Sequence, residues 1–378
     1  DRLTERIERD VDVVTGEAEK TTLKDTEPAV LATNGKVIDR LVVAESGAGS
    51  VGSASLDEPV GLSTAIDTAG SGGAVFLKEG NYTTPGETVP GGQSLIAAGD
   101  TVMLRTPDER FYVPFRLTGD EQRPSIEGTT AKPTLRLDTG TDGQTLHGLE
   151  FTGSGQAVKS HQNADVVISN VVVRNDQRGG SNSLQVTKAS GDWTLKDLEI
   201  TTEDGPGSSS NTSVNFDSST ADVEIRNSFI ELRNIGDNGI RFDRADASGT
   251  VAIVNTSVKG NEGNSQEGIS VTGVRTVSLR NVRAENNLKQ NIEITDVGSL
   301  RADSITIRNG PALDIGPADE ATVDGLQISE YKNVALSIFE TDNVSIRNFL
   351  IQNKDGSGKA ISVVGSELND HFFQGTVR

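Results

Sequence analysis

The chain has 378 residues, of which 34% are hydrophobic and 4% aromatic, a sparse supply for one large rounded core. It carries 55 acidic and 35 basic residues and a formal net charge of −20, which argues against a nucleic acid partner because phosphate binding requires a basic patch. There is no cysteine and no run of about 18 apolar residues, so disulfides and cysteine-bound metals are excluded and no membrane span is expected.

The acidic residues are spread along the whole chain and allow two interpretations. One is a solvated surface suited to high salt, where screening removes the repulsion between like charges. The other is disorder, which high charge and low hydrophobicity also favour. The regular apolar periodicity of the chain favours the first, a folded protein of a halophilic system.

Residues 1–60 are predicted to form an N-terminal attachment or oligomerisation segment, followed by a solenoid over 61–378. Within 1–20, apolar residues recur at intervals of three and four, as on one face of a helix. A helix this short needs a partner. That partner is either the end of its own solenoid or other chains, in a homo-oligomer (a trimer is expected) or a larger virion assembly. The Gly- and Ser-rich stretch 46–55 is typical of a flexible linker.

A short motif recurs from residue 145 to the end of the chain, with alternating apolar positions on both sides of a turn residue. The turn residues are Gly148, Asn170, Asp197, Asn227, Asn255, Asn281, Ser304, Gly325, Asn348 and Gly375. Their spacings of 21 to 30 residues, with apolar residues at every second position, indicate one coil of a β-solenoid per repeat. Asn, Asp and Gly suit a sharp bend because they tolerate a left-handed backbone.

Asn227, Asn255 and Asn281 fall on successive coils. They are expected to stack about 4.8 Å apart, the distance between neighbouring strands, and to hydrogen-bond along the axis. A buried structural ladder is the simpler interpretation of this row, and a binding ladder is the alternative.

A second family of short strands lies between these motifs, such as SVNFD at 213–217 and GISVT at 268–272. Each coil therefore has at least two parallel strands. The residues expected to point outward from the second family, coil by coil, are Lys159, Gln185, Asn215, Arg241, Ser270, Glu293, Asp314, Ser337 and Ser362.

This pattern resembles the pectin-lyase-like family of right-handed parallel β-helices over about residues 61–378. The resemblance implies an all-β, right-handed parallel β-helix solenoid of about ten or more coils, with a short N-terminal helix and a capping helix. The stretch 61–82 is similar to the start of that fold, with Ser63 and Thr64 as helix starts and the apolar side of the helix facing the first coil. With residues 1–60 in front, the layout resembles that of viral tailspikes.

Carbohydrate enzymes of this fold work on the outer face of one sheet, so the outward row is the place to look for chemistry. Glu293 and Asp314 lie on adjacent coils, with an expected carboxyl separation of about 5 Å, near that of a retaining glycosidase pair. They are the candidate catalytic residues, although neighbouring acids also arise by chance in so acidic a chain. The candidate substrate-binding residues are Arg241, with a role in holding an acidic sugar, and Asn215, Ser270 and Lys159.

Three functions remain open at this point. The first is an extracellular surface or virion projection, tailspike-like, that binds cell-surface carbohydrate. The alternatives are a secreted polysaccharide lyase or glycoside hydrolase, and a structural projection without a ligand. No cofactor is expected to be required. Any cation on the acidic surface would be Ca²⁺ or a monovalent ion held by carboxylates, because the chain has only three histidines.

Overall fold

The structure is a computed structural model. It describes residues 29–31, 37–38, 40–52, 54–105, 113–118, 122–128, 132–140, 143–153, 156–177, 182–204, 212–233, 238–244, 248–260, 267–353, 358–365 and 372–378. The helix predicted over 1–20 lies outside these residues, and with it the segment to which attachment and oligomerisation were assigned.

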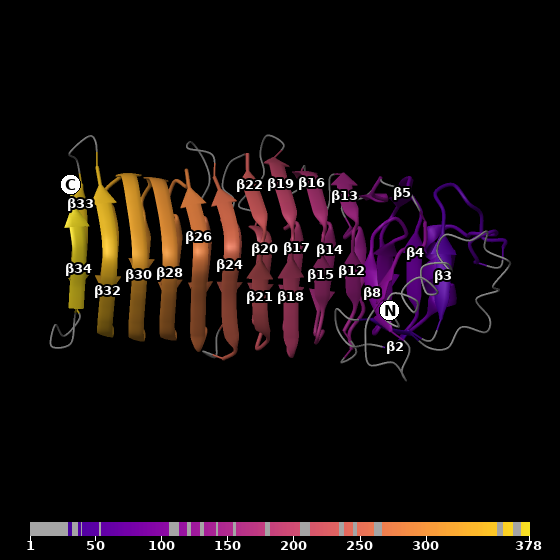
Figure 1. Ribbon diagram of the computed structural model, residues 1–378, viewed down its shortest axis with the longest axis horizontal. Helices are drawn as coiled ribbons and strands as arrows, with labels where there is room; N and C mark the ends of the chain where they lie inside the picture. Colours follow the sequence, from indigo (N-terminus) through magenta and orange to yellow (C-terminus); the bar gives the residue numbers. More distant parts are fainter. Residues whose placement is uncertain are drawn as a thin grey trace, which may run out of the picture.

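The described residues form a parallel β-solenoid, as the repeat predicted (Figure 1). Two long sheets run along one axis, and a small antiparallel sheet lies at the N-terminal end. The small sheet holds β1 (Ala29–Leu31), β2 (Val37–Ile38), β8 (Val102–Arg105) and β9 (Val113–Phe115).

The eleven-stranded sheet is formed by the second strand family. Its strands, in order along the axis, are β6 (Glu87–Val89), β11 (Leu135–Leu137), β14 (Val158–His161), β17 (Leu184–Thr187), β20 (Thr212–Asp217), β23 (Asn238–Asp243), β25 (Ile269–Thr272), β27 (Ile292–Thr295), β29 (Leu313–Ile315), β31 (Val334–Phe339) and β33 (Lys359–Val364).

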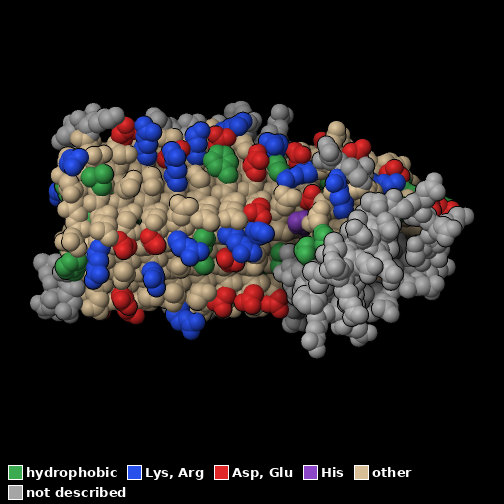
Figure 2. Space-filling view, in the orientation of Figure 1, with side chains coloured by type: hydrophobic (Ala, Val, Ile, Leu, Met, Phe, Trp, Pro, Cys, Tyr) green, Lys and Arg blue, Asp and Glu red, His purple; other side chains and the backbone are tan. Residues whose placement is uncertain are grey.

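The nineteen-stranded sheet is formed by the turn-centred motifs and by strands that precede the first motif, before residue 145 in the chain. Its strands are β3 (Leu41–Ala44), β4 (Ala74–Leu77), β5 (Asn81–Thr84), β7 (Ser94–Ala97), β10 (Ser125–Gly128), β12 (Thr145–His147), β13 (Glu150–Gly153), β15 (Val167–Ser169), β16 (Val172–Gln177), β18 (Asp192–Lys196), β19 (Glu199–Asp204), β21 (Asp222–Arg226), β22 (Phe229–Leu232), β24 (Thr250–Lys259), β26 (Thr276–Glu285), β28 (Val297–Gly310), β30 (Ala318–Tyr331), β32 (Thr341–Gln352) and β34 (Phe372–Val377). Acidic and basic side chains lie side by side on the face drawn in Figure 2.

The N-terminal end of the solenoid is covered by the one helix of the described residues, α2 (Leu62–Ala69). Ala65, Ile66 and Ala69 are buried, as expected for a capping helix, but the helix begins at Leu62, so Ser63 and Thr64 lie in its first turn. The side-chain amide of Gln93 donates to the carbonyl of Ile66 at 2.8 Å and so fastens the end of the helix to the first coils.

The chain before residue 61 already takes part in the solenoid. Strand β3 pairs in parallel with β4. The backbone N–H of Val43 donates to the carbonyl of Ala54 at 2.8 Å, and Ala54 is buried. The stretch 46–55, expected to be a flexible linker, is thus partly held against β3, because its backbone pairs with a strand of the first coil. The division between attachment segment and solenoid stays a prediction.

The predicted turn residues adopt the left-handed backbone, with Gly375 as the exception. At Asn227, Asn255 and Asn281 φ is 52°, 49° and 52°. Gly375 lies instead against the ring of Phe349, where a β-carbon would collide, and the pairing register shifts there. The turn chemistry read from the sequence therefore holds through the inner coils and changes at the last one.

An amide ladder connects the turns of successive coils. The side-chain amide of Asn281 donates to Asn255 at 3.0 Å, Asn255 donates to Asn227 at 3.1 Å, and Asn227 donates to the Asp197 carboxylate at 3.1 Å. All three asparagines are exposed. The expectation of a buried ladder is wrong, because the left-handed bend at each of these positions turns the side chain outward.

The interior is a continuous apolar core that runs along the axis. Trp193, Phe216 and Phe242 lie in a row inside it and are almost fully buried. Trp193 packs edge-on against Phe216 with ring centroids 5.4 Å apart, and Phe216 stacks on Phe242 at 5.0 Å. Their inward positions agree with the alternation of apolar residues along these strands. These rings pack on the inner face of β20 and β23, so the backbone that carries the outward side chains of these strands is held by a close-packed core.

The left-handed turns contribute to stability. We expect Asn255→Ala to lower the free energy of unfolding by about 1–2 kcal/mol. In the left-handed conformation the β-carbon of alanine lies too close to the following carbonyl oxygen. Asn255→Gly keeps that conformation accessible and removes only the amide hydrogen bonds, so its loss should be smaller. Denaturant unfolding of both variants measures the difference, and a larger loss in the glycine variant would contradict this explanation.

Candidate functional site

The outward row predicted from the sequence is formed residue by residue in the eleven-stranded sheet. Lys159 pairs with Gln185, Gln185 with Asn215, and Asn215 with Arg241. The row continues through Ser270, Glu293, Asp314, Ser337 and Ser362. Because these strands are parallel and in register, side chains of successive coils stand about 4.8 Å apart.

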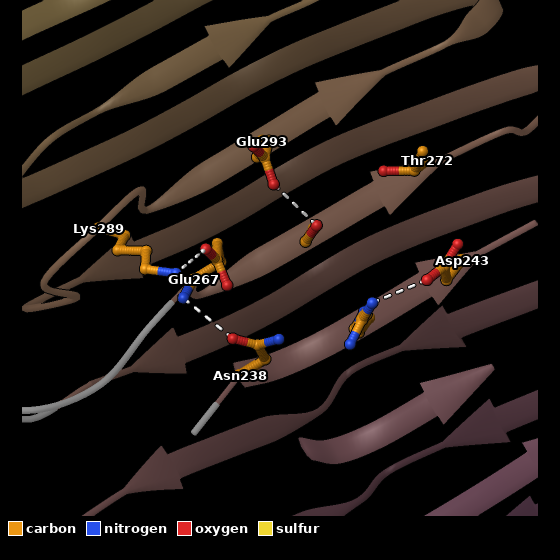
Figure 3. Close-up of a pocket in the computed structure, with 8 residues that line it drawn as sticks. Asn238, Asp243, Glu267, Thr272, Lys289 and Glu293 are labelled. Carbon is orange, nitrogen blue, oxygen red and sulfur yellow. Dashed lines mark hydrogen bonds and ion pairs between the residues drawn. The ribbon is translucent and has the colours of Figure 1, made fainter. Parts of the chain in front are cut away.

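One stretch of this row lies in a hollow of about 430 Å³ over β23, β25 and β27, here called the β23–β27 hollow. This volume lies within the range of ligand pockets. Its lining is entirely polar and consists of Asn238, Arg241, Asp243, Glu267, Ser270, Thr272, Lys289 and Glu293 (Figure 3).

The lining residues form three files across the three strands. Arg241, Ser270 and Glu293 are the central file and belong to the predicted outward row. The second file lies at the strand ends and consists of Asp243 and Thr272, which pair with each other. They lie two residues after Arg241 and Ser270, respectively. The third file consists of Asn238 at the start of β23 and of Glu267 and Lys289, which precede β25 and β27.

The hollow brings together three of the six predicted site residues: Arg241, Ser270 and Glu293. Asn215, Lys159 and Asp314 occupy their predicted places in the row but do not line the hollow. The hollow spans three coils, because its lining residues lie on β23, β25 and β27 or directly before these strands.

Sequence reasoning missed Asn238, Glu267, Thr272 and Lys289 as site residues. Three of them lie outside the alternating strand pattern, in or beside the turns, whose lengths vary between coils. The available signal was position: Asn238, Glu267 and Lys289 stand three or four residues before an outward residue of the central file, and Thr272 stands two residues after Ser270.

Four of the five charged groups of the hollow form two ion pairs. Arg241 donates to the Asp243 carboxylate at 2.7 Å, and Lys289 lies 3.5 Å from the Glu267 carboxylate. The amide oxygen of Asn238 accepts from the backbone N–H of Glu267 at 3.2 Å, which fixes the turn that carries the acid (Figure 3).

Glu293 is the carboxyl group of the hollow with a shifted pKa. Burial raises the pKa of Glu293 above its usual value of 4.5, and the nearby carboxylates of Glu267 and Asp314 raise it further. The hydroxyl of Ser270, which donates to Glu293 at 3.0 Å, and the charge of Lys289 act in the opposite direction. A raised pKa keeps a glutamic acid protonated to a higher pH than usual, which is the direction that a proton donor requires.

Asp314 follows Glu293 in the row, on the adjacent strand β29. Its Oδ1 is buried and has no hydrogen-bond partner among the described residues. Two carboxyl groups of different surroundings thus stand on neighbouring coils. Their placement on adjacent coils is confirmed, and their roles as a catalytic pair stay a prediction.

Within the described part of the chain, no group of three or more His, Asp and Glu side chains is arranged to hold a metal ion. No helix in that part is long and apolar enough to cross a membrane.

The shifted pKa of Glu293 predicts a pH-dependent effect on stability. A carboxyl group whose pKa is raised by folding stabilises the fold below the usual pKa of 4.5 and loses that contribution as the pH rises through the raised value. We therefore expect Glu293→Gln to melt at a higher temperature than the wild type at pH 7, and the difference to vanish below about pH 4.

Thermal melting across this pH range measures the effect. Glu320→Gln, at an exposed position on β30, makes the same change in net charge and serves as the control. A gain that is independent of pH, or one that is equal in the control, would show that the burial of Glu293 is not its source.

The comparisons with known proteins find neither a matching family model nor a matching curated sequence. Solved structures with the same fold are found. Pectate lyase Pel9A is 13% identical, with 90% of this chain and 80% of that chain covered and a TM-score of 0.39. Bacteriophage CBA120 tailspike protein 3 is 10% identical, with 100% and 68% covered and a TM-score of 0.47.

Geobacillus virus E2 ORF18 is also 10% identical, with a TM-score of 0.50; 89% of this chain and 62% of that chain, less than two thirds of its length, are covered. At 10% identity, the likeness to ORF18 shows the fold alone. The strand pairing makes the described part of the chain an all-β parallel β-solenoid.

Proposed function

We propose that this protein binds carbohydrate on the outer face of its eleven-stranded sheet, with the β23–β27 hollow as the main binding site. The observation that carries the proposal is the hollow itself, which offers charged, amide and hydroxyl groups and no apolar side chain. A ligand covered with hydroxyl groups satisfies such a lining, because each hydroxyl both donates and accepts hydrogen bonds and those to charged groups are the strongest.

The ligand is a chain that lies along the solenoid axis. The row of polar side chains extends beyond the hollow on both sides, to Asn215 and Gln185 in one direction and to Asp314 in the other. Repeating groups in the protein, spaced by one strand separation, favour a repeating ligand over a small molecule that fills one pocket.

We infer a tailspike-like surface or virion projection in an extracellular, salty setting. The elongated fold, the net charge of −20 and the N-terminal segment support this inference. That segment is the proposed route to a homo-oligomer, with a trimer as the expected state and a larger virion assembly as the setting. No cofactor is assigned to this function, and Ca²⁺ or monovalent cations on the acidic surface stay a proposal. Thermal melting at increasing KCl concentration tests the salty setting. We expect the melting temperature to rise, because added salt screens the repulsion between acidic side chains.

Blocking the hollow tests the binding site. Ser270→Trp places a large ring on the floor of the hollow, whereas Ser337→Trp makes the same change three coils away in the same row. In high salt, against a panel of immobilised cell-surface polysaccharides, we expect Ser270→Trp to lose at least about ten-fold in affinity, which is about 1.4 kcal/mol. The Ser337→Trp protein should retain most of its binding.

Equal binding by both tryptophan variants and the wild type would move the site elsewhere on the protein. Binding of no polysaccharide by a folded wild-type protein would favour the structural projection without a ligand. Melting temperatures of all three proteins verify that loss of binding is not loss of folding.

A second function, glycoside hydrolysis or polysaccharide lysis, is favoured by one observation: the raised pKa of Glu293 beside the half-buried carboxyl group of Asp314. In hydrolysis, Glu293 would protonate the leaving oxygen and Asp314 would attack or stabilise the sugar ring. New reducing ends or unsaturated products in the same incubations, lost in Glu293→Gln and Asp314→Asn, would establish an enzyme. Binding without products in the wild type would leave a binding protein.

A further inference from the structure

The charges of the β23–β27 hollow carry an inference about which carbohydrate it accepts. The lining contains two cations, Arg241 and Lys289, and three carboxyl groups, Asp243, Glu267 and Glu293. Each cation already has a carboxylate partner, at 2.7 Å for Arg241 and 3.5 Å for Lys289. Both cations of the lining are therefore engaged by acids, and neither is left to bind the carboxylate of an acidic sugar.

The surroundings of the hollow add further acidic groups on the same sheet. Asp217 pairs with Asp243 from the preceding coil, and Asp314 follows Glu293 on the next coil. The charges that act on Glu293 are two carboxylates, Glu267 and Asp314, and one cation, Lys289. A polyanion that enters this site therefore meets net repulsion, in addition to the field of a protein with a net charge of −20.

We propose that the hollow selects uncharged glycans and rejects polyuronates and other acidic polysaccharides. This inference rests on the proposed function and names its substrate class. It replaces the role expected for Arg241, because the guanidinium that was assigned to an acidic sugar is engaged by Asp243. The Arg241–Asp243 and Lys289–Glu267 pairs instead place hydrogen-bond donors and acceptors next to each other. Neighbouring hydroxyl groups of one sugar then contact both members of a pair.

The Arg241–Asp243 pair also explains how selectivity is maintained. Both side chains are about half exposed, 45% and 50%, so a uronate reaches them. An exposed ion pair is weak, but the Asp243 carboxylate remains two residues from Arg241 whether or not the two touch. An incoming carboxylate thus competes with an acid that is tethered to the same strand.

Binding of two matched oligosaccharides tests the proposal: a neutral hexose oligomer and a uronate oligomer of the same length, each titrated calorimetrically into the full chain. We expect the neutral oligomer to bind more tightly, with an affinity that changes less than about two-fold between 0.1 and 1 M KCl, because an uncharged ligand has no screening dependence. Tighter binding of the uronate by the wild type would overturn the proposal and leave carbohydrate binding intact. Binding of neither oligomer would overturn both.

Asp243→Asn tests the physical cause. Removal of this carboxylate frees Arg241, so affinity for the uronate should rise about two- to five-fold at low salt, the range of an exposed ion pair. Asp217→Asn makes the same change of charge in the same file, one coil away, and should not produce this gain. If the two variants behave alike, net charge rather than the Arg241–Asp243 pair governs selectivity, and the assignment to that pair is wrong.

Discussion

The in-register stacking of parallel coils is the constraint on which the rest of this structure depends. Each strand obtains its backbone hydrogen bonds from the coils above and below, so the coils stay aligned residue by residue. A position in one coil therefore becomes a row along the axis. The apolar rows form the core, the asparagine row forms the exposed amide ladder, and the outward row of the eleven-stranded sheet forms the surface proposed to bind carbohydrate.

The same constraint shows why much of the fold was predictable from the sequence. A stacked solenoid repeats its inside and outside positions in every coil, so the alternation of apolar residues revealed the strands, and the spacing of Asn, Asp and Gly revealed the turns. The pairing of Arg241 with Ser270 and of Ser270 with Glu293 followed from aligning the repeats.

Features that depend on the turns between strands were not predictable in this way. Turn lengths differ from coil to coil, so alignment of the repeats does not place Asn238, Glu267 or Lys289 beside the central file. The ion-pair partners of charged groups could not be predicted from the sequence either, because the pairing of Arg241 with Asp243 depends on the direction of the side chains along one strand. For that reason the sequence assigned Arg241 to an acidic sugar, whereas its neighbourhood in the fold favours an uncharged one.

The proposed ligand lies across β23, β25 and β27. A neutral oligosaccharide with a photoreactive group at its reducing end, cross-linked to the full chain and mapped by mass spectrometry, tests this placement most directly. We expect cross-links in peptides that span 238–243, 267–272 and 289–293, and unlabelled oligosaccharide should suppress them. Competed cross-links confined to the nineteen-stranded sheet, or to residues 1–60, would contradict this placement.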